Sequence, residues 1–461
     1  MKRLMYWMVS ILLLGSMTFA GCGNSASVRD PKNIAKYTFK QLGEDVMPIG
    51  GYIGPPPADP FPGNTWSDEC PDYITEEQYQ YIEDSGVNVI YGLKEDYATF
   101  SQSTMTALNL AQQHGIVYIA SDSRLYDIEK GIVPSNQEFD EKTASYRNHP
   151  AFGGIYLKDE PGAKLFETIA DIKEVFDDWK VGYNINLLPT YAQPEQLSGE
   201  SNVSMTYEEY LSQYMEIVQP AFISYDYYPC MGTFPELMGG YYENMRIVRK
   251  YAQEYGVPYW TFIQCGGPWE KNEQVRYPSE AELLWQVNSG LAFGAKGIQY
   301  FPYFFPPEWT QPGHEDTVAG LIGRDGKPSP LYTYAQKANA QIAAIDEVLM
   351  NSYNDGIMMR GMGGTPMNPG QGEEKILLSE YYELKSIDKE SVDCIVGCFN
   401  HQGKSVFYVV NNTIDEDGTV ILHFDKKYGM EITQNAEKHS VTEQDLTLTL
   451  TAGEGALVVL K

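Results

Sequence analysis

The chain has 461 residues, enough for about three domains of ordinary size, or for one barrel of roughly 250 to 300 residues plus a smaller module. Hydrophobic residues make up 43% and charged residues 21%, which excludes a mostly disordered chain, a fibre and a polytopic membrane protein. Acidic residues number 62 and basic residues 33, giving a formal net charge of −29. Because such a surface repels phosphate backbones, we do not expect nucleic acid as a partner.

The N-terminus has the pattern of a signal peptide. Lys2 and Arg3 precede an apolar run at 4–20, which is too short for a comfortable transmembrane helix. The run ends in TFAGC at 18–22, which resembles the lipobox of bacterial lipoproteins. The resemblance implies loss of residues 1–21 and a palmitate-bearing lipid anchor on Cys22, which would hold the protein in the cell envelope on the extracytoplasmic face of the membrane. An ordinary secretory signal, the alternative, also places the chain outside the cytoplasm.

Eight apolar segments alternate with helical patterns from about residue 47 to 350. The predicted strands are 47–53, 87–93, 116–121, 152–158, 181–187, 221–227, 257–264 and 297–303. They are continuously apolar, as in a parallel sheet buried on both faces. Capping boxes at Thr75–Gln78 and Ser279–Glu282 indicate helix starts. Eight such units in about 300 residues predict a (β/α)8 TIM barrel; a doubly wound open sheet is the alternative, but its GxGxxG fingerprint is absent.

The remaining segments complete a predicted domain organisation. Short apolar runs separated by turn clusters at 375–461 predict an antiparallel β-sandwich of about 100 residues. We therefore expect a signal peptide at 1–21, a tether at 22–45, a barrel at 46–350 and a β-sandwich at 351–461.

Barrel enzymes place their reactive groups at the C-terminal ends of the strands. Those ends carry carboxylates, amides and phenols: Tyr52, Asp122, Asp159, Glu160, Asn184, Asn186, Tyr225, Asp226, Tyr227, Tyr228, Gln264, Tyr300 and Tyr303. This ring, with few cations, suits a neutral polyhydroxylated ligand, so we expect a carbohydrate substrate. The candidate substrate-binding residues are Tyr225, Gln264, Asn184, Asn186 and Tyr300, with Trp269 and Trp309 as stacking rings in the loops after the seventh and eighth strands.

The sharpest feature is the acid pair Asp159-Glu160, followed by Pro161, at the end of the fourth strand. Two acids at the mouth of a buried strand repel each other, and desolvation raises their pKa further. A carboxyl that stays protonated near neutral pH can act as a general acid, as glycoside cleavage requires. The competing interpretation is structural: a carboxylate that caps the following helix or pairs with Lys158.

This segment resembles the Asn-Glu-Pro segment of the (β/α)8 glycoside hydrolases, the large clan that includes β-galactosidases and cellulases. Residues 284–301 and 324–328 are similar to the closing units of family 42-like glycosidases, and 446–460 is similar to the small β-sandwich that such enzymes often carry. The resemblance implies a glycosidase with Glu160 as acid/base.

One departure from the clan concerns the second carboxylate. The clan's nucleophile is a Glu at the end of the seventh strand, where this chain has Gln264, and an amide cannot form the covalent intermediate. Asp159 also replaces the usual Asn. Three alternatives remain open, of which we rank Asp226 first: Asp226 as base or nucleophile; substrate assistance, as in similar sites for N-acetylhexosamines; or a loop acid, Glu270 or Glu273.

The sequence gives no indication of a metal or cofactor. The six histidines have no paired spacing, and we expect neither a catalytic metal nor a cofactor. Gln264 favours an alternative function from another class: a surface lipoprotein that binds glycans on a glycosidase-like barrel without cutting them.

Overall fold

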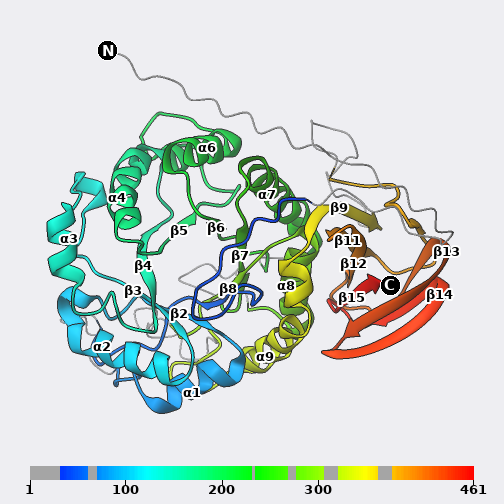
Figure 1. Ribbon diagram of the computed structural model, residues 1–461, viewed down its shortest axis with the longest axis horizontal. Coiled ribbons are helices and arrows are strands. Elements are labelled where there is room, and N and C mark those ends of the chain that lie inside the picture. The colour runs from blue at the N-terminus through cyan, green and yellow to red at the C-terminus, as the bar shows by residue number, and fades with distance from the viewer. Residues whose placement is uncertain (1–31, 61–69, 231–233, 268–276, 306–319, 362–375) are drawn as a thin grey trace, which may run out of the picture.

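Eight parallel strands close into a barrel (Figure 1). The computed structural model describes residues 32–60, 70–230, 234–267, 277–305, 320–361 and 376–461. The barrel strands are β1 (Ile49–Gly51), β2 (Val89–Gly92), β3 (Val117–Ala120), β4 (Phe152–Asp159), β5 (Tyr183–Leu187), β6 (Ile223–Tyr225), β7 (Tyr259–Gln264) and β8 (Ile298–Phe301). Gly50 pairs with Val89 on one side and with Gln299 on the other, which closes the ring. The predicted TIM barrel is confirmed.

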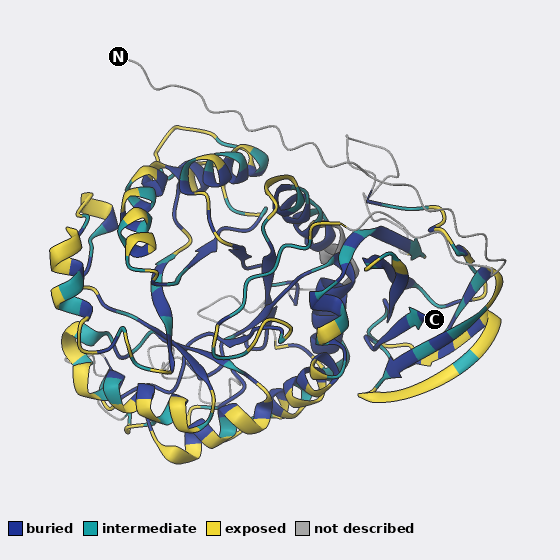
Figure 2. Cartoon of the chain, in the orientation of Figure 1, coloured by how far each residue is buried: buried dark blue, intermediate teal, exposed yellow. Residues whose placement is uncertain are grey.

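Helices surround the barrel and expose their polar faces (Figures 1 and 2). They are α1 (Glu76–Ser85), α2 (Tyr97–Gln113), α3 (Asn136–Thr143), α4 (Phe166–Asp178), α5 (Pro194–Ser198), α6 (Tyr207–Gln213), α7 (Phe234–Tyr255), α8 (Glu280–Phe293), α9 (Pro330–Ala343) and α10 (Asp346–Met350). Short helical turns lie at Ile128–Lys130, Ala163–Leu165 and Tyr214–Val218. The Ser279–Glu282 box forms with both reciprocal bonds. Thr75 caps Gln78, but the Gln78 amide donates instead to the Gly326 carbonyl, at 2.7 Å, and so ties α1 to the loop before α9.

Side chains alternate between two cores along the barrel strands. On β3, Val117 and Ile119 point into the barrel, whereas Tyr118 packs in the layer between strands and helices. On β7, Trp260 and Phe262 point inward in the same way. This alternation decides which strand-end residues can reach the mouth of the barrel.

An N-terminal segment covers the end of the barrel at which the strands begin. Residues 32–46, in blue, cross the barrel in Figure 1. The ring centroids of Tyr37 and Phe39 lie 5.9 and 6.1 Å from that of Trp260, and Tyr37 also lies 4.6 Å from Phe222. These contacts cover the barrel interior at the N-terminal ends of the strands. Most of the segment falls within the predicted tether.

The C-terminal module is one antiparallel sheet of seven strands, as predicted for an all-β unit. The strands are β9 (Tyr353–Arg360), β10 (Leu384–Ile387), β11 (Cys394–His401), β12 (Lys404–Asn411), β13 (Gly418–Gln434), β14 (Glu437–Leu450) and β15 (Gly455–Leu460). A register irregularity interrupts the β13–β14 pairing between His423 and Tyr428. On β12, Phe407 and Val409 face the module's own core, while Tyr408 joins the barrel core and donates to Asn288 of α8. The sheet therefore buries one face in the module's own core and packs the other against the barrel.

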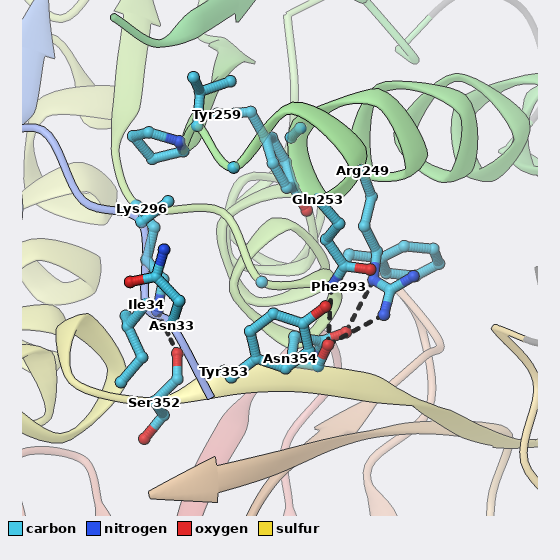
Figure 3. A pocket seen from close by; sticks show the side chains of 16 residues that line it. Asn33, Ile34, Arg249, Gln253, Tyr259, Phe293, Lys296, Ser352, Tyr353 and Asn354 are labelled. Carbon is cyan, nitrogen blue, oxygen red and sulfur yellow. Dashed lines mark hydrogen bonds between the residues drawn. The ribbon is translucent and has the colours of Figure 1, made fainter. Parts of the chain in front are cut away.

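A small pocket of about 60 Å³ lies at the junction between the two units (Figure 3). Arg249 and Gln253 of α7 both donate to Asn354 of β9. Lys296 is buried and donates to the carbonyls of Leu349 and Ser352. Burial lowers the pKa of this amine to about 7. The hydrogen bonds of Arg249, Gln253 and Lys296 thus hold the two units together.

No helix within the described ranges is long and apolar enough to cross a membrane. The predicted signal peptide and Cys22 lie outside those ranges.

Candidate functional site

A β-bulge turns Asp159 toward the inside of the barrel. Tyr156 pairs with Asn184 of β5, but Lys158 pairs with Ile185 and Asp159 with Asn186, so one extra residue is inserted. Leu157 packs in the helix-side core, and Lys158 bonds to Glu129 at 3.1 Å on the outer side. Leu157 and Lys158 thus both point outward, and Asp159 points to the inside of the barrel, as Tyr156 does.

Tyrosine and asparagine donors hold the Asp159 carboxylate. Its Oδ1 accepts hydrogen bonds from the Tyr156 hydroxyl, at 3.0 Å, and from Asn186 Nδ2, at 3.2 Å. The Tyr52 hydroxyl in turn bonds to that of Tyr156. Burial, and then the charge of Asp159, raise the pKa of both phenols, so both stay protonated. Both donors bind Oδ1, and the residue is exposed at the mouth.

Asn186 is itself held by a column of polar side chains in the barrel. Its Oδ1 accepts from Ser224 at 3.3 Å, and Ser224 accepts from Gln299 at 2.7 Å. Below them Asn184 donates to Tyr91 at 2.7 Å and, at 3.5 Å, to Gln299. Asn184 is therefore part of the barrel interior, and Asn186 supports Asp159 from below.

Glu160 adopts a strained backbone conformation at the mouth. Its φ is 44°, in the left-handed region, which costs a non-glycine residue about 1 kcal/mol. The Glu160 N–H donates to the Asn186 carbonyl at 2.8 Å, which helps to hold this conformation. The side chain is exposed. Strain of this kind tends to occur where a side chain must be aimed.

Neither structural role considered for the Asp159-Glu160 pair is observed. Lys158 forms its ion pair with Glu129. Gly162 and Leu165, the N-cap positions of the two helical segments that follow, receive no side-chain capping bond. The acids are thus engaged neither in capping nor with Lys158.

Glu160 forms a hydrogen-bonded carboxyl pair with Asp226, which follows β6. Asp226 is only 5% exposed, and burial, followed by the charges of Glu160 and Asp159, raises its pKa well above the ordinary range. The pKa of Glu160 is also raised, by burial and by Asp159, while its bond from Asp226 acts in the opposite direction. The raised pKa values mean that this pair retains a proton at a pH where an isolated carboxyl has lost it, and the two groups titrate together.

The structure does not bring all predicted residues to the mouth. Tyr225 and Tyr300 are wholly buried between strands and helices, where Tyr300 donates to Asn339 of α9. Both point outward because their neighbours Ser224 and Gln299 point into the barrel. The prediction that these two phenols contact substrate is therefore corrected by the side-chain alternation of β6 and β8.

Gln264 is fixed in the wall beside the mouth. Its Oε1 accepts from the Cys230 N–H at 2.8 Å, and its Nε2 donates to the carbonyls of Cys230 and Gly266 at 3.4 and 3.3 Å. The side chain is completely buried. Its amide ties the loop after β6 to the end of β7, and in this conformation it does not contact a ligand.

Sequence reasoning missed two tyrosines, Tyr156 and Tyr191. Tyr156 was passed over because it precedes the strand end, whereas Tyr228, which interacts with Asp226, was among the phenols expected at the end of the sixth strand. Tyr191, in the loop after β5, lies near Asp226 and Glu160. The only available signal was the abundance of tyrosine.

Other predictions concern residues outside the described ranges. These are Trp269, Trp309, Glu270, Glu273 and Cys22. Within those ranges, no group of three or more His, Cys, Asp or Glu side chains could hold a metal ion.

Among the comparisons with known proteins, only the one with solved structures finds similar proteins. No family model matches the sequence, and no curated protein matches it. A family 39 glycoside hydrolase from Bacteroides cellulosilyticus is 12% identical, with 91% of this chain and 82% of that chain covered and a TM-score of 0.49. A GH27 β-L-arabinopyranosidase from Geobacillus stearothermophilus is 9% identical (92% and 98% covered, TM-score 0.47), and a glucosidase from Croceicoccus marinus is 10% identical (94% and 99%, TM-score 0.42). With similarity this low, a functional assignment has to come from the residues at the strand ends.

Proposed function

We propose that this protein is a glycoside hydrolase that cleaves O-glycosidic bonds of oligo- or polysaccharides, with Glu160 as general acid/base. The observation that carries the proposal is the hydrogen-bonded pair of Glu160 and Asp226 at the open end of the barrel, with the Asp159 carboxylate beside it. Such a pair retains a proton at a pH where an isolated carboxyl has lost it.

The proton is delivered by the exposed member of the pair. Glu160 can contact the glycosidic oxygen, whereas Asp226 is buried behind it. As Glu160 gives a proton to the leaving oxygen, the bond between that oxygen and the anomeric carbon breaks. Water supplies the incoming hydroxyl, and its second proton returns to the pair. Asp226 acts here as a positioning residue that keeps the proton on the pair between turnovers.

Asp159 is the carboxylate that faces the positive charge of the oxocarbenium-like transition state. Asp226 is buried and titrates together with Glu160, so we assign it to retaining the proton and not to attack on the anomeric carbon. Asp159 is exposed, and Tyr156 and Asn186 fix its Oδ1. A fixed negative charge at this point stabilises the oxocarbenium-like transition state.

A glycan-binding protein without hydrolytic activity is the second candidate function. It is favoured by Gln264, whose amide is committed to the backbone of Cys230 and Gly266 and supplies no nucleophile.

The two functions separate in one experiment. The wild type is assayed on a panel of aryl glycosides and, in parallel, on a glycan array, together with Glu160→Gln and Glu167→Gln. Glu167 is an exposed acid in the first turn of α4, so it is a matched control for the change of charge. We expect release of aglycone by the wild type and the control, with a loss of 100-fold or more in Glu160→Gln. Binding without any release would favour the second candidate.

We further propose that Cys22 carries a lipid and anchors the enzyme to the extracytoplasmic face of the membrane. The support is the sequence 18–22 alone. Labelling of cells with an alkyne-modified palmitate should mark the wild type but not Cys22→Ala. Equal labelling of both would contradict the anchor.

A further inference from the structure

Tyr191 presents an aromatic ring that is both exposed and held in place. Its side chain lies in the loop between β5 and α5 and is 46% exposed. Its ring centroid lies 5.0 Å from that of Tyr227, with the planes at 71°, and Tyr227 is buried. The edge contact with a buried ring limits the orientation of Tyr191, although much of its ring remains accessible.

The ring lies beside the carboxyl pair. Tyr191 follows β5, which pairs with β4 on one side and with β6 on the other, and Glu160 and Asp226 directly follow those two strands. Tyr227, which holds the ring, directly follows Asp226 in the chain. A molecule stacked on Tyr191 would therefore lie next to the groups that exchange a proton.

Charge at this place restricts what can bind. The charged groups that act on Glu160 and Asp226 are acids: each other and Asp159. A ligand that brought a further negative charge into this field would be repelled.

We propose that Tyr191 is the stacking platform of the sugar subsite next to the Glu160–Asp226 pair, and that its ligand is a neutral pyranose with an unhindered C–H face. This inference deepens the proposed hydrolase function by naming its substrate class. An aromatic face supplies apolar contact to the C–H groups of a sugar, and its polar edge tolerates the hydroxyls. A ring already held by its contact with Tyr227 loses little entropy when the sugar binds.

Binding is measured in the Glu160→Gln protein, so that no turnover interferes. Titration calorimetry with the 4-nitrophenyl β-glycosides of galactose, glucose and N-acetylglucosamine tests neutral pyranoses, and the glucuronide tests an anionic one. Tyr191→Ala should weaken binding of the neutral ligands about tenfold, equal to 1.4 kcal/mol. Tyr191→Phe keeps the ring and should retain affinity within about threefold.

Tyr382 offers a matched control in the C-terminal module. It is 53% exposed and makes an edge contact with Tyr381 at 4.8 Å. Tyr382→Ala should bind as the parent does. Equal affinity of Tyr191→Ala and Tyr382→Ala, tight binding of the glucuronide, or no binding of any neutral glycoside would overturn the proposal.

The kinetics of the same substitutions on the wild-type background keep the two proposals apart. If the wild type hydrolyses a glycoside and Tyr191→Ala leaves its KM unchanged, the platform is wrong and the hydrolase stands. If nothing is hydrolysed but Tyr191→Ala weakens binding, the platform stands and the hydrolase is wrong.

Discussion

The buried carboxyl of Glu95 makes the stability of the protein depend on pH. Glu95 follows β2, is 1% exposed, and accepts a hydrogen bond at Oε1 from the Tyr118 hydroxyl at 2.6 Å. Its Oε2 has no hydrogen-bond partner among the described residues. Burial raises the pKa of this group from 4.5 to about 7, because the charged form is poorly solvated there.

The sign and size of the effect follow from linkage. Between pH 4.5 and 7 the folded protein retains the Glu95 proton and the unfolded chain loses it, so the free energy of unfolding falls as pH rises. The stabilisation is complete below pH 4.5 and is lost as pH rises through 7. At 1.36 kcal/mol per unit of pKa, the loss is about 3 kcal/mol.

Glu95→Gln removes this titration and keeps an acceptor for Tyr118. We expect the difference in unfolding free energy between wild type and variant to change by about 3 kcal/mol between pH 4.5 and 8, with the variant relatively more stable at high pH. Urea unfolding followed by circular dichroism at several pH values measures it. Glu167→Gln, on the surface, should keep the wild-type pH dependence. Parallel curves for wild type and Glu95→Gln would refute the reasoning.

Three further outcomes are expected at the mouth. Asp159→Asn should move the alkaline limb of the pH–rate profile to lower pH, since the charge of Asp159 raises the pKa of Glu160; an unmoved limb would contradict that coupling. Asp226→Asn should remove an infrared band of a protonated carboxylic acid at pH 7, and identical spectra would place the proton elsewhere. Gln264→Glu should give no gain in kcat and a loss of about 3 kcal/mol in stability, because a carboxylate would face two carbonyls; higher activity at full stability would show that the side chain reaches the ligand.

The sequence predicts the barrel well because its strands are continuous apolar runs punctuated by capping residues. The observed β4, at Phe152–Asp159, lies within a residue of the expected 152–158. The acid pair was found for the same reason, since strand ends are functional positions in this fold.

The orientation of side chains was harder to predict. An apolar run buried on both faces does not show which residues point inward, so Tyr225 and Tyr300 were assigned to the mouth although they pack against helices. The bulge at Leu157 and Lys158 reverses the alternation without any distinctive residue. The contact between Glu160 and Asp226 joins residues that are far apart in the chain, and only barrel closure brings them together.

The dependence of the rate on the leaving group tests the central claim most directly. A proton from Glu160 matters most when the departing alcohol is a poor leaving group, and little when it leaves readily as a phenolate. We predict that Glu160→Gln loses far more kcat/KM on an alkyl glycoside than on the 2,4-dinitrophenyl glycoside of the same sugar, relative to wild type and Glu167→Gln. An equal loss on both substrates, or no loss on either, would contradict the assignment of Glu160 as the general acid.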